Sequence, residues 1–350
     1  MIVKNEEAVL ARCLDSIKAA VDEINIIDTG STDATKSIAA KYTSRIFDFQ
    51  WIHHFAAARN FSFQQATKDY ILWLDADDII TNEELVKLQH LKLTLSPTVD
   101  AVSMHYHLNF DTEGNVTYSL RRNRLVRRQR QFQWIGAVHE YLAVDGTIIH
   151  SDIAISHQPL SRDASRNLAI YERLLTAGEG FSTRDLYYYA NELKDHRQYE
   201  KAISFYEQFL ATEQGWVEDC IQACFKMADC YSALQNEKRA IQSITRSLTF
   251  DSPRPEACCR FGFYFMEQHK NQQAIYWYEQ ALTIKEPSHT PFRNHIFTTW
   301  LPHLQLCVLY DRLQQYELAY EHHIQAKSFY PTHPQILHNE QYFQQLFPER

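Results

Sequence analysis

The sequence changes its pattern near Pro159. Up to about residue 160, short β-branched runs alternate with stretches of helical periodicity, which is typical of a layered α/β fold. Beyond Pro159 the pattern is helical to the last residue. A chain of 350 residues is long for one domain and comfortable for two. We therefore expect an α/β domain over residues 1–160, a helical linker over 161–185 and an all-α domain over 186–350.

The helical half repeats itself at the spacing of tetratricopeptide repeats. Four segments each carry small residues followed by Tyr or Phe, and their recurring alanines are 38, 34 and 45 residues apart: Ala202, Ala240, Ala274 and Ala319. The expected period is about 34 residues. Small residues let paired helices approach, and aromatic residues fill the gaps between neighbouring pairs. This need accounts for much of the 13% aromatic content and for only eight glycines. We expect tetratricopeptide-like repeats, with an unrelated helical bundle as the alternative.

Charge and composition exclude several classes of protein. The net charge of −8 argues against a nucleic-acid binder, which needs a basic surface to neutralise phosphates. No apolar run approaches 18 residues, so no transmembrane segment is expected. The seven cysteines form no CxxC pair, and their odd number fits reduced thiols in a cytoplasmic protein. Most of them fall in helical patterns, which favours small apolar packing.

The α/β half begins with short strands and helices. We expect strands at Met1–Val3, Glu23–Asp28, Arg45–Phe49 and Tyr70–Leu74, and later at Val102–Leu108, Thr117–Leu120, Leu125–Arg127 and Ile148–Ile155. Helices are expected at about Glu7–Ala20, Asp33–Lys41 and Ala57–Thr67, with Ser31 and Thr32 as cap candidates of the second. The first strand is short, so either the fold tolerates it or the true start lies upstream.

The tripeptide Asp75-Ala76-Asp77 follows a strand that is almost wholly apolar. Ligands in open α/β sheets bind where strands end at their carboxyl edge, and Asp28 lies at another such end. Two carboxylates one residue apart can share a hard divalent cation with a nucleotide diphosphate. Alone, this pattern is common in solvated turns, so the surrounding motifs must decide its meaning.

Those motifs resemble a known family. The stretches Lys4-Asn5-Glu6-Glu7, Asp28-Thr29-Gly30-Ser31-Thr32-Asp33, Ala58-Arg59-Asn60 and Trp73-Leu74-Asp75-Ala76-Asp77 resemble successive motifs of family 2 glycosyltransferases with a GT-A fold. Later stretches, Trp134 to Glu140 and Ile155-Ser156-His157, resemble the subset that carries tetratricopeptide repeats. That subset includes the sublancin-type peptide glycosyltransferases, which modify bacteriocin Cys or Ser side chains. The resemblance implies a Rossmann-like nucleotide-diphospho-sugar transferase domain over about residues 1–165.

The resemblance also implies roles for individual residues. Asp28 would bind the nucleobase, Arg59 and Asn60 would approach the nucleotide, and Asp75 would contact the ribose or the metal. Asp77 would ligate Mn²⁺ or Mg²⁺, which stabilises the charge of a departing diphosphate. UDP is the nucleotide that the resemblance favours. From its place after an apolar strand, His157 would complete the metal site or touch the diphosphate, with an ordinary surface histidine as the alternative.

Transfer with inversion requires a carboxylate that takes the proton of the acceptor. Glu140 is the candidate, because His139-Glu140 follows a glycine-containing turn and lies near the strand that leads to His157. Asp78 and Asp111 are rivals for the catalytic role. The alternative for Glu140 is a structural carboxylate bonded to backbone or to an arginine.

Two further stretches are candidates for ligand contacts. Six arginines fall within Arg121–Arg130, either as a wall that holds a diphosphate or an acidic acceptor, or as a solvated hairpin paired with acidic residues. The second interpretation is favoured for most of the six. The aromatic residues Trp51, His53, His54 and Phe55 are candidates for a sugar pocket, although Trp51 fits a core equally well.

Three functions remain open. The first is an enzyme that transfers a sugar from a nucleotide donor to a polypeptide Ser, Thr or Cys side chain, with the repeats holding the peptide. The second is a glycosyltransferase of surface polysaccharide or glycolipid synthesis, whose repeats serve dimerisation or docking. The third is an adaptor with an inactive transferase half, which the retained carboxylates Asp28, Asp75 and Asp77 count against. A nucleotidyltransferase would need a glycine-rich phosphate loop near Met1, which the sequence lacks.

Overall fold

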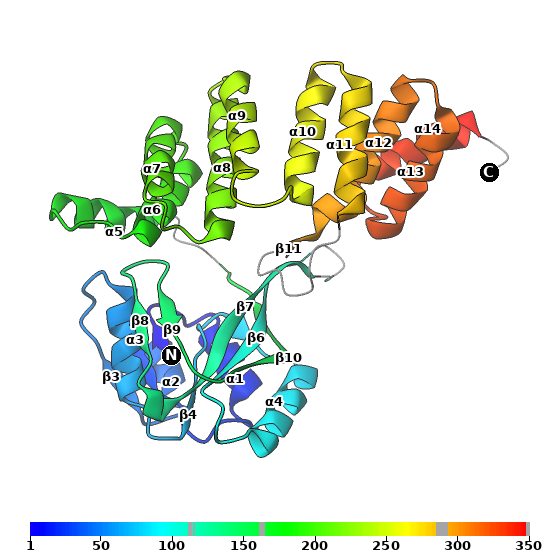
Figure 1. Ribbon diagram of the computed structural model, residues 1–350. Helices are drawn as coiled ribbons and strands as arrows, with labels where there is room; N and C mark the ends of the chain where they lie inside the picture. The colour runs from blue at the N-terminus through cyan, green and yellow to red at the C-terminus, as the bar shows by residue number, and fades with distance from the viewer. Residues whose placement is uncertain (111–113, 115, 161–164, 285–292, 348–350) are drawn as a thin grey trace. The chain divides into compact units, whose positions relative to one another are not determined.

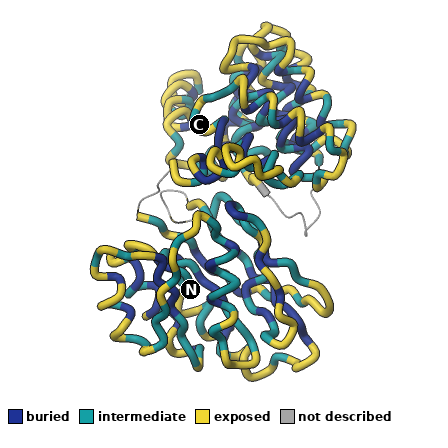
Figure 2. Tube along the Cα trace, turned by 90° about the vertical axis from the view of Figure 1, so that its left-hand side faces the viewer, coloured by how far each residue is buried: buried dark blue, intermediate teal, exposed yellow. Residues whose placement is uncertain are grey.

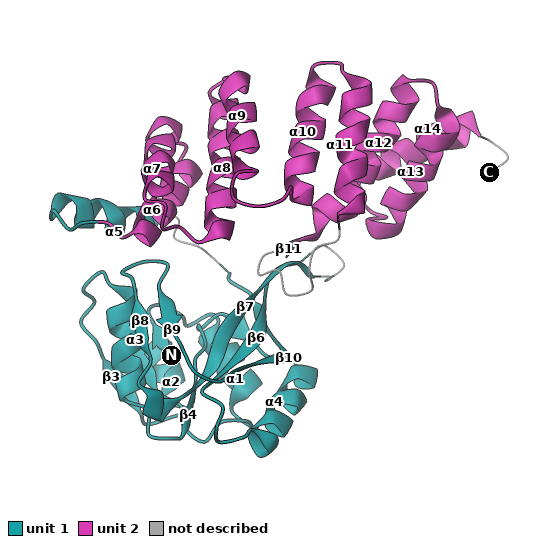
Figure 3. Cartoon of the chain, viewed as in Figure 1, with its two compact units in different colours: residues 1–180 teal, residues 181–350 magenta. Residues whose placement is uncertain are grey.

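The computed structural model describes residues 1–110, 114, 116–160, 165–284 and 293–347. The chain divides into two compact units, Met1–Gly180 and Phe181–Arg350 (Figure 3). Unit 1 holds the strands and helices of the α/β half, whereas helices dominate unit 2 (Figure 1). An α/β domain followed by an all-α domain is the fold class that the sequence predicts.

Unit 1 contains a small parallel sheet in the order β1-β2-β3. These strands are Ile2–Val3, Ile26–Asp28 and Ile46–Asp48, and β1 pairs with β2 through Ile2↔Ile27 and Val3↔Asp28. Three helices connect the strands along the chain: α1 (Leu10–Ile17), α2 (Thr35–Ala39) and α3 (Phe55–Gln64). The two-residue β1 is therefore integrated into the sheet.

The expected capping of α2 by Ser31 or Thr32 is wrong. The N-cap of α2 is Ala34, and no side chain caps it. Ser31 Oγ instead accepts a hydrogen bond from the backbone N–H of Asn5 at 3.0 Å. Ser31 and Thr32 thus contact Asn5, in the chain that follows β1, and neither caps the helix.

A second sheet of unit 1 has the strand order β4-β7-β6-β10-β5. The strands are β4 (Tyr70–Leu72), β5 (Asp78–Ile79), β6 (Ala101–Phe110), β7 (Val116–Arg127) and β10 (Ile148–His157). Strands β6 and β10 are parallel, and the remaining pairs are antiparallel. The sequence predicted two strands between Thr117 and Arg127, but the structure has the single strand β7 there. This strand pairs with β6 and, at its end, with β4, and register shifts in the pairing with β6 let it continue past the intervening polar residues.

Further elements complete unit 1. Helix α4 spans Asn82–Thr94, and the hairpin strands β8 (Gln133–Ile135) and β9 (Tyr141–Ala143) pair through Ile135↔Tyr141. A short 3₁₀ turn (η1, Arg128–Arg130) precedes the hairpin, and α5 (Ser165–Thr176) follows β10. The main apolar core contains Val102 and Met104 of β6 with Ile153 and Ile155 of β10. This core supports the strands whose ends carry the predicted site.

Unit 2 is built from helix pairs. Its helices are α6 (Thr183–Asp195), α7 (Tyr199–Ala211), α8 (Val217–Ala233), α9 (Glu237–Ser247), α10 (Pro255–Glu267), α11 (Asn271–Thr283), α12 (Trp300–Arg312), α13 (Tyr316–Phe329) and α14 (Pro334–Leu346), with short elements β11 (Arg293–Asn294) and η2 (His295–Thr298) before α12. Consecutive helices from α6 to α13 form four antiparallel pairs (Figure 1). The four recurring segments of the sequence are these pairs.

The recurring alanines are the contact points of the pairs. All four lie on the second helix of a pair and are at most 3% exposed: Ala202, Ala240, Ala274 and Ala319. Buried stretches lie between the helices of this unit (Figure 2). All seven cysteines are buried free thiols, six of them in these helices. Small apolar packing is thus their structural role.

Candidate active site

The first motif holds the turn that follows β2. Asn5 Oδ1 accepts from the backbone N–H of Thr32 at 2.8 Å, and Glu7 Oε2 accepts from that of Ala34 at 2.8 Å. Asn5 itself has a positive φ of 56°, which lets its side chain reach this turn. The motif Lys4-Asn5-Glu6-Glu7 therefore holds the turn after β2 in place, beside the carboxyl ends of β1 and β2.

Asp28 ends β2 and is only 1% exposed. Its Oδ2 accepts from the backbone N–H groups of Gly30 at 3.1 Å and Ser31 at 3.0 Å, and Lys36 Nζ lies 3.5 Å away. Burial opposes its ionisation, but the hydrogen bonds from Ser31 and Gly30 hold the pKa of Asp28 below its usual value. The expected contact with a nucleobase would require some of these bonds to be exchanged.

Asp75 and Asp78 close a tight turn between β4 and β5. The backbone N–H of Asp75 donates to Asp78 Oδ2 at 2.9 Å, and that of Asp78 donates to the Asp75 carbonyl at 3.1 Å. Asp78 is fully buried, so its carboxylate has no access to an acceptor. This burial argues against the catalytic role that the sequence suggested for Asp78 and favours a positioning role.

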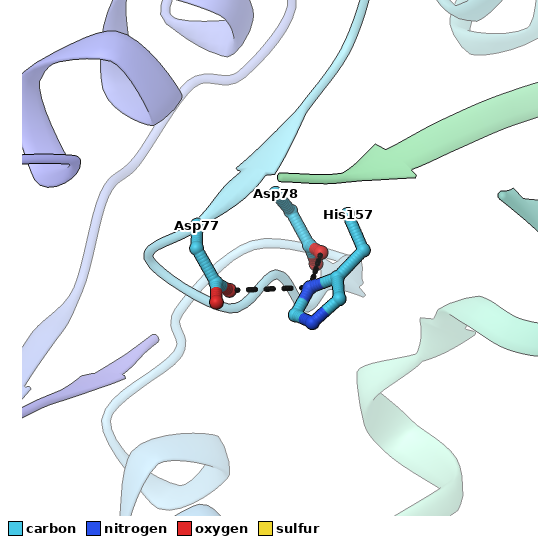
Figure 4. A group of neighbouring side chains, drawn as sticks. All are labelled: Asp77, Asp78 and His157. Carbon is cyan, nitrogen blue, oxygen red and sulfur yellow. Dashed lines mark ion pairs between the residues drawn. The ribbon is translucent and has the colours of Figure 1, made fainter. Parts of the chain in front are cut away.

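Asp77, Asp78 and His157 converge at the end of this turn (Figure 4). Strand pairing places His157, the last residue of β10, directly opposite Asp78. His157 Nδ1 lies 3.4 Å from Asp77 Oδ1 and 3.6 Å from Asp78 Oδ1. Burial lowers the pKa of His157, but Asp77 and Asp78 outweigh it and raise the pKa to about 9. Among the described residues, these three are the group of His, Cys, Asp and Glu side chains arranged to hold a metal ion.

The cluster fits a divalent cation. His157 Nδ1 is buried and faces the Asp77 and Asp78 carboxylates without a well-aligned hydrogen bond in the described part of the chain, and Asp77 is 24% exposed. Carboxylate oxygens suit Mg²⁺ and Mn²⁺, and an imidazole nitrogen is a ligand of transition metals. The sequence expected Asp75 in this set, whereas the structure puts Asp78 beside His157 and turns the Asp75 carboxylate to an arginine.

That arginine is Arg59 of α3. Its Nη2 lies 2.8 Å from Asp75 Oδ1, its Nε donates to Glu140 Oε1, and its guanidinium lies over the Trp73 and Trp134 rings. Burial opposes the charge of Arg59, but Asp75 and Glu140 outweigh it and raise its pKa. Burial also disfavours ionised Asp75, yet Arg59 and the nearby Arg124 lower the pKa of Asp75. Arg59 is thus a clamp between two carboxylates at the site.

The neighbouring Asn60 has a different role from the one expected. Its Nδ2 donates to the Trp134 carbonyl at 3.0 Å, and its Oδ1 accepts from the Trp134 backbone N–H at 2.8 Å. Both ends of the amide are therefore used to attach β8 to α3. The expectation that Asn60 contacts the nucleotide is corrected on this ground.

Glu140 lies at the end of the β8–β9 hairpin loop. Gly136 and His139 both have positive φ, 105° and 50°, and the Ala137 carbonyl accepts from the Phe55 backbone N–H at 2.8 Å. A histidine in the left-handed region is an uncommon conformation that clusters at functional sites. The loop directs the Glu140 carboxylate to Arg59, which matches the alternative of a carboxylate bonded to an arginine.

A pocket of about 530 Å³ contains these groups. Arg59, Asp75, Asp77, Glu140 and His157 all line it, as do Trp51, His53 and Phe55. The fourth aromatic candidate, His54, instead caps α3 by accepting from the Ala57 backbone N–H at 3.2 Å. A volume of this size suits a small-molecule ligand.

Sequence reasoning assigned no individual role to Glu6 or Tyr106, which also line the pocket. Burial and the nearby Asp77 raise the pKa of Glu6 to about 7. The hydroxyl of Tyr106 donates to Asp78 Oδ1 at 2.9 Å. Glu6 belongs to the motif next to β1, and this was the sequence signal for its place in the pocket, whereas Tyr106 lies within an ordinary strand pattern.

The arginines of the segment Arg121–Arg130 lie in different environments. Arg122 lines the pocket, and Arg124 is fully buried. Arg127 and Arg130 lie near Asp100, each with a closest nitrogen–oxygen distance of 3.7 Å, as expected of arginines paired with acidic residues. The segment is thus not one continuous wall. The rival base Asp111 lies outside the described residues.

Comparisons with known proteins agree with this organisation. The family described as glycosyl transferase family 2 matches residues 1–150, and the tetratricopeptide repeat family matches residues 221–253. A tetratricopeptide-repeat-containing protein of Synechococcus elongatus is 35% identical over 140 residues, which cover 40% of this chain and 34% of that protein. No helix in the described ranges is both long and apolar enough to cross a membrane.

A second relative extends into the helical half. The SPbeta prophage-derived glycosyltransferase SunS of Bacillus subtilis is 25% identical over 225 residues, which cover 59% of this chain and 51% of that protein. The chain spans about a third to a half of the length of these curated relatives. Among solved structures, MamA matches 52% of this chain and 92% of its own at 15% identity, with a TM-score of 0.37. The family matches show a glycosyl transferase family 2 domain at residues 1–150 and a tetratricopeptide repeat at residues 221–253.

Proposed function

We propose that the chain is a metal-dependent inverting glycosyltransferase that moves a sugar from a nucleoside diphosphate, UDP being favoured, to a polypeptide side chain. The observation that carries the proposal is that Asp77 and His157, two members of the candidate metal cluster, line a pocket of unit 1, whose residues 1–150 match glycosyl transferase family 2. Similarity to a protein named glycosyltransferase SunS supports the reaction class.

In the proposed site, Asp77 and His157 would hold Mn²⁺ or Mg²⁺, with the buried Asp78 behind them. Bound there, the cation would neutralise the diphosphate as the bond to the sugar breaks. Lys4, Arg122 and Arg166 line the same pocket and supply further positive charge for phosphate oxygens. Trp51 and Phe55, with ring centroids 4.8 Å apart, provide apolar surface for the sugar.

Glu140 is the proposed general base. Its side chain is 10% exposed, lines the pocket and forms an ion pair with Arg59, and a carboxylate is the kind of group that can take a proton from an acceptor. Release of this pair when an acceptor binds would leave Glu140 free to take the proton of a Ser, Thr or Cys side chain. Asp75 and Glu140 both pair with Arg59. In the proposed site, one guanidinium therefore links the carboxylate on the side of the sugar donor to the carboxylate that acts on the sugar acceptor.

The helical repeats are proposed to hold the peptide acceptor. Solenoids of this kind present extended surfaces that bind polypeptide segments. The competing proposal is transfer to a surface polysaccharide or glycolipid, with the repeats used for docking or for a homodimer. The resemblance of the sequence motifs to the sublancin-type peptide glycosyltransferases favours a peptide.

The test begins with the full chain and a panel of nucleotide sugars. With Mn²⁺ present, the cognate donor is expected to raise the melting temperature by mass action, and its hydrolysis should follow. Mass spectrometry of a peptide library incubated with that donor should then show the added sugar. Transfer to saccharide or lipid acceptors, with none to peptides, would favour the competing proposal. A panel in which no nucleotide sugar binds or reacts would contradict both.

A truncation separates the roles of the two units. Residues 1–180 alone are expected to hydrolyse the donor but to lose transfer to peptide, provided that circular dichroism and a cooperative melt show the fragment to be folded. Full peptide transfer by the folded fragment would refute the role of the repeats.

A further inference from the structure

Arg124 is the most deeply buried arginine of the arginine-rich segment. It lies on β7, is 0% exposed, and its guanidinium is stacked between the rings of Trp73 at 3.9 Å and Tyr106 at 4.2 Å. Its Nε and Nη2 have no hydrogen-bond partner among the described residues. A side chain with this burial cannot contact a substrate, so its role must pass through its neighbours.

The carboxylate neighbour of Arg124 is Asp78. Arg124 Nη1 lies 3.0 Å from Asp78 Oδ2 and also donates to the Trp73 carbonyl at 3.2 Å. Asp78 Oδ2 accepts in addition from the Asp75 backbone N–H, and Oδ1 accepts from the Tyr106 hydroxyl. One buried carboxylate thus joins β6, β7 and the turn that carries Asp75 and Asp77.

This network ends at the metal cluster. Asp78 stands opposite His157 in the strand pairing, and the backbone N–H of Gln158 donates to the Asp77 carbonyl at 2.9 Å. The turn and the end of β10 are therefore fixed to each other, with Asp78 at their junction (Figure 4). Groups behind metal ligands orient those ligands and commonly alter metal affinity roughly 10- to 100-fold.

We propose that Arg124 is a positioning residue that, through Asp78, holds Asp77 and His157 in the arrangement that binds the divalent cation. The inference rests on the proposed metal-dependent function. Without Arg124, Asp78 would be a buried carboxylate lacking its cation, which is strongly destabilising. The turn would then move to rehydrate Asp78, and Asp77 and His157 would separate.

The experiment measures Mn²⁺ binding to the full chain by isothermal titration calorimetry, together with the melting temperature in EDTA. Arg124→Met is expected to weaken Mn²⁺ binding by roughly 10-fold or more, and Tyr106→Phe, which removes one hydrogen bond to Asp78, by a smaller factor. Arg124→Lys keeps the charge and is expected to fall between Arg124→Met and the wild type. The matched control is Arg121→Met, on the same strand but exposed, where affinity should be unchanged.

The outcomes distinguish the inference from the function on which it rests. Variants at Arg124 or Tyr106 that melt at a lower temperature but bind Mn²⁺ as tightly as the wild type would show a merely structural role and overturn the inference alone. If Arg124→Met does not fold, Tyr106→Phe and Arg124→Lys decide by the same criterion. A wild-type chain that binds no Mn²⁺ would overturn the proposed metal site and the inference together.

Discussion

The two units differ in how their most deeply buried side chains are held. Unit 1 buries charged groups such as Asp28, Asp78 and Arg124, each at most 1% exposed and each held by particular partners. Unit 2 buries small and aromatic residues at recurring positions, such as Ala274 and Tyr278. The first unit thus depends on individual interactions of buried charged groups, and the second on packing positions that recur from one helix pair to the next. Changes at the polar groups of unit 1 should therefore affect metal and donor binding and turnover, and changes in the helix packing of unit 2 should affect stability.

The largest effect is expected from Glu140→Gln in unit 1. Loss of the general base should lower turnover by roughly 100-fold or more, while the neutral amide keeps the shape of the side chain and donor binding remains. Steady-state transfer assays with donor-binding titrations test this. The control is Glu83→Gln, whose carboxylate is 79% exposed. Loss of donor binding with retained turnover per bound donor would instead make Glu140 a structural carboxylate.

In unit 2, Gly262→Ala should destabilise the fold without affecting the site. A Cβ at Gly262 would meet the buried Tyr278 ring at 2.8 Å, so the free energy of unfolding should fall by about 2–3 kcal/mol. Calorimetric unfolding measures this, and the transition of unit 2 is the one that Mn²⁺ and UDP do not shift. Gly180→Ala, where a Cβ meets open space, is the control. An Mn²⁺ affinity altered by Gly262→Ala would break the separation of the two units.

The pH dependence of unit 2 gives a smaller effect. Burial raises the pKa of Asp219 from 3.8 to about 6. Its contribution to stability is therefore present below about pH 4 and is lost as the pH rises through about 6. At pH 7, Asp219→Asn should unfold with a free energy about 1–2 kcal/mol higher than the wild type, and the difference should vanish near pH 4. Urea unfolding at both pH values tests this, and a wild type that is the more stable at pH 7 would contradict it.

The smallest effect concerns the turns within the helix pairs. After α6, α8, α10 and α12, a non-glycine residue has a positive φ of 57–59°: Arg197, Gln235, His269 and Gln314. Glycine is favoured at such helix ends, so Gln235→Gly should stabilise unit 2 by less than about 1 kcal/mol.

In unit 1, His139→Gly relieves the same conformation but should lower turnover, because it loosens the loop that holds Glu140. If both variants changed stability and turnover alike, the expected difference between the two units would be contradicted.

The sequence predicted features that local pattern encodes. The repeats follow from alanines at a fixed spacing, and the carboxylates at the ends of β2 and β4 follow from apolar runs that stop at Asp28 and Asp75. These properties need no knowledge of which strands pair.

The missed features depend on pairing across long stretches of chain. The partner of Asp78 is Arg124, 46 residues later, and only the strand order of the second sheet brings them together. Asn60 was misassigned because its partner, the Trp134 backbone, comes from a hairpin 74 residues further on. The predicted capping of α2 was wrong, and the Ser31 hydroxyl instead accepts a hydrogen bond from the backbone N–H of Asn5, in another segment.

The central claim is that unit 1 binds a nucleoside diphosphate through a cation held by Asp77 and His157. The most direct measurement is calorimetric titration of UDP into the full chain, in Mn²⁺ and in EDTA, for the wild type and Asp77→Ala. We expect the wild type to bind UDP at least roughly tenfold more tightly in Mn²⁺ than in EDTA. Asp77→Ala should remove this difference while its melting temperature in EDTA stays near that of the wild type. UDP binding of equal strength in Mn²⁺ and EDTA, or unchanged in Asp77→Ala, would contradict it.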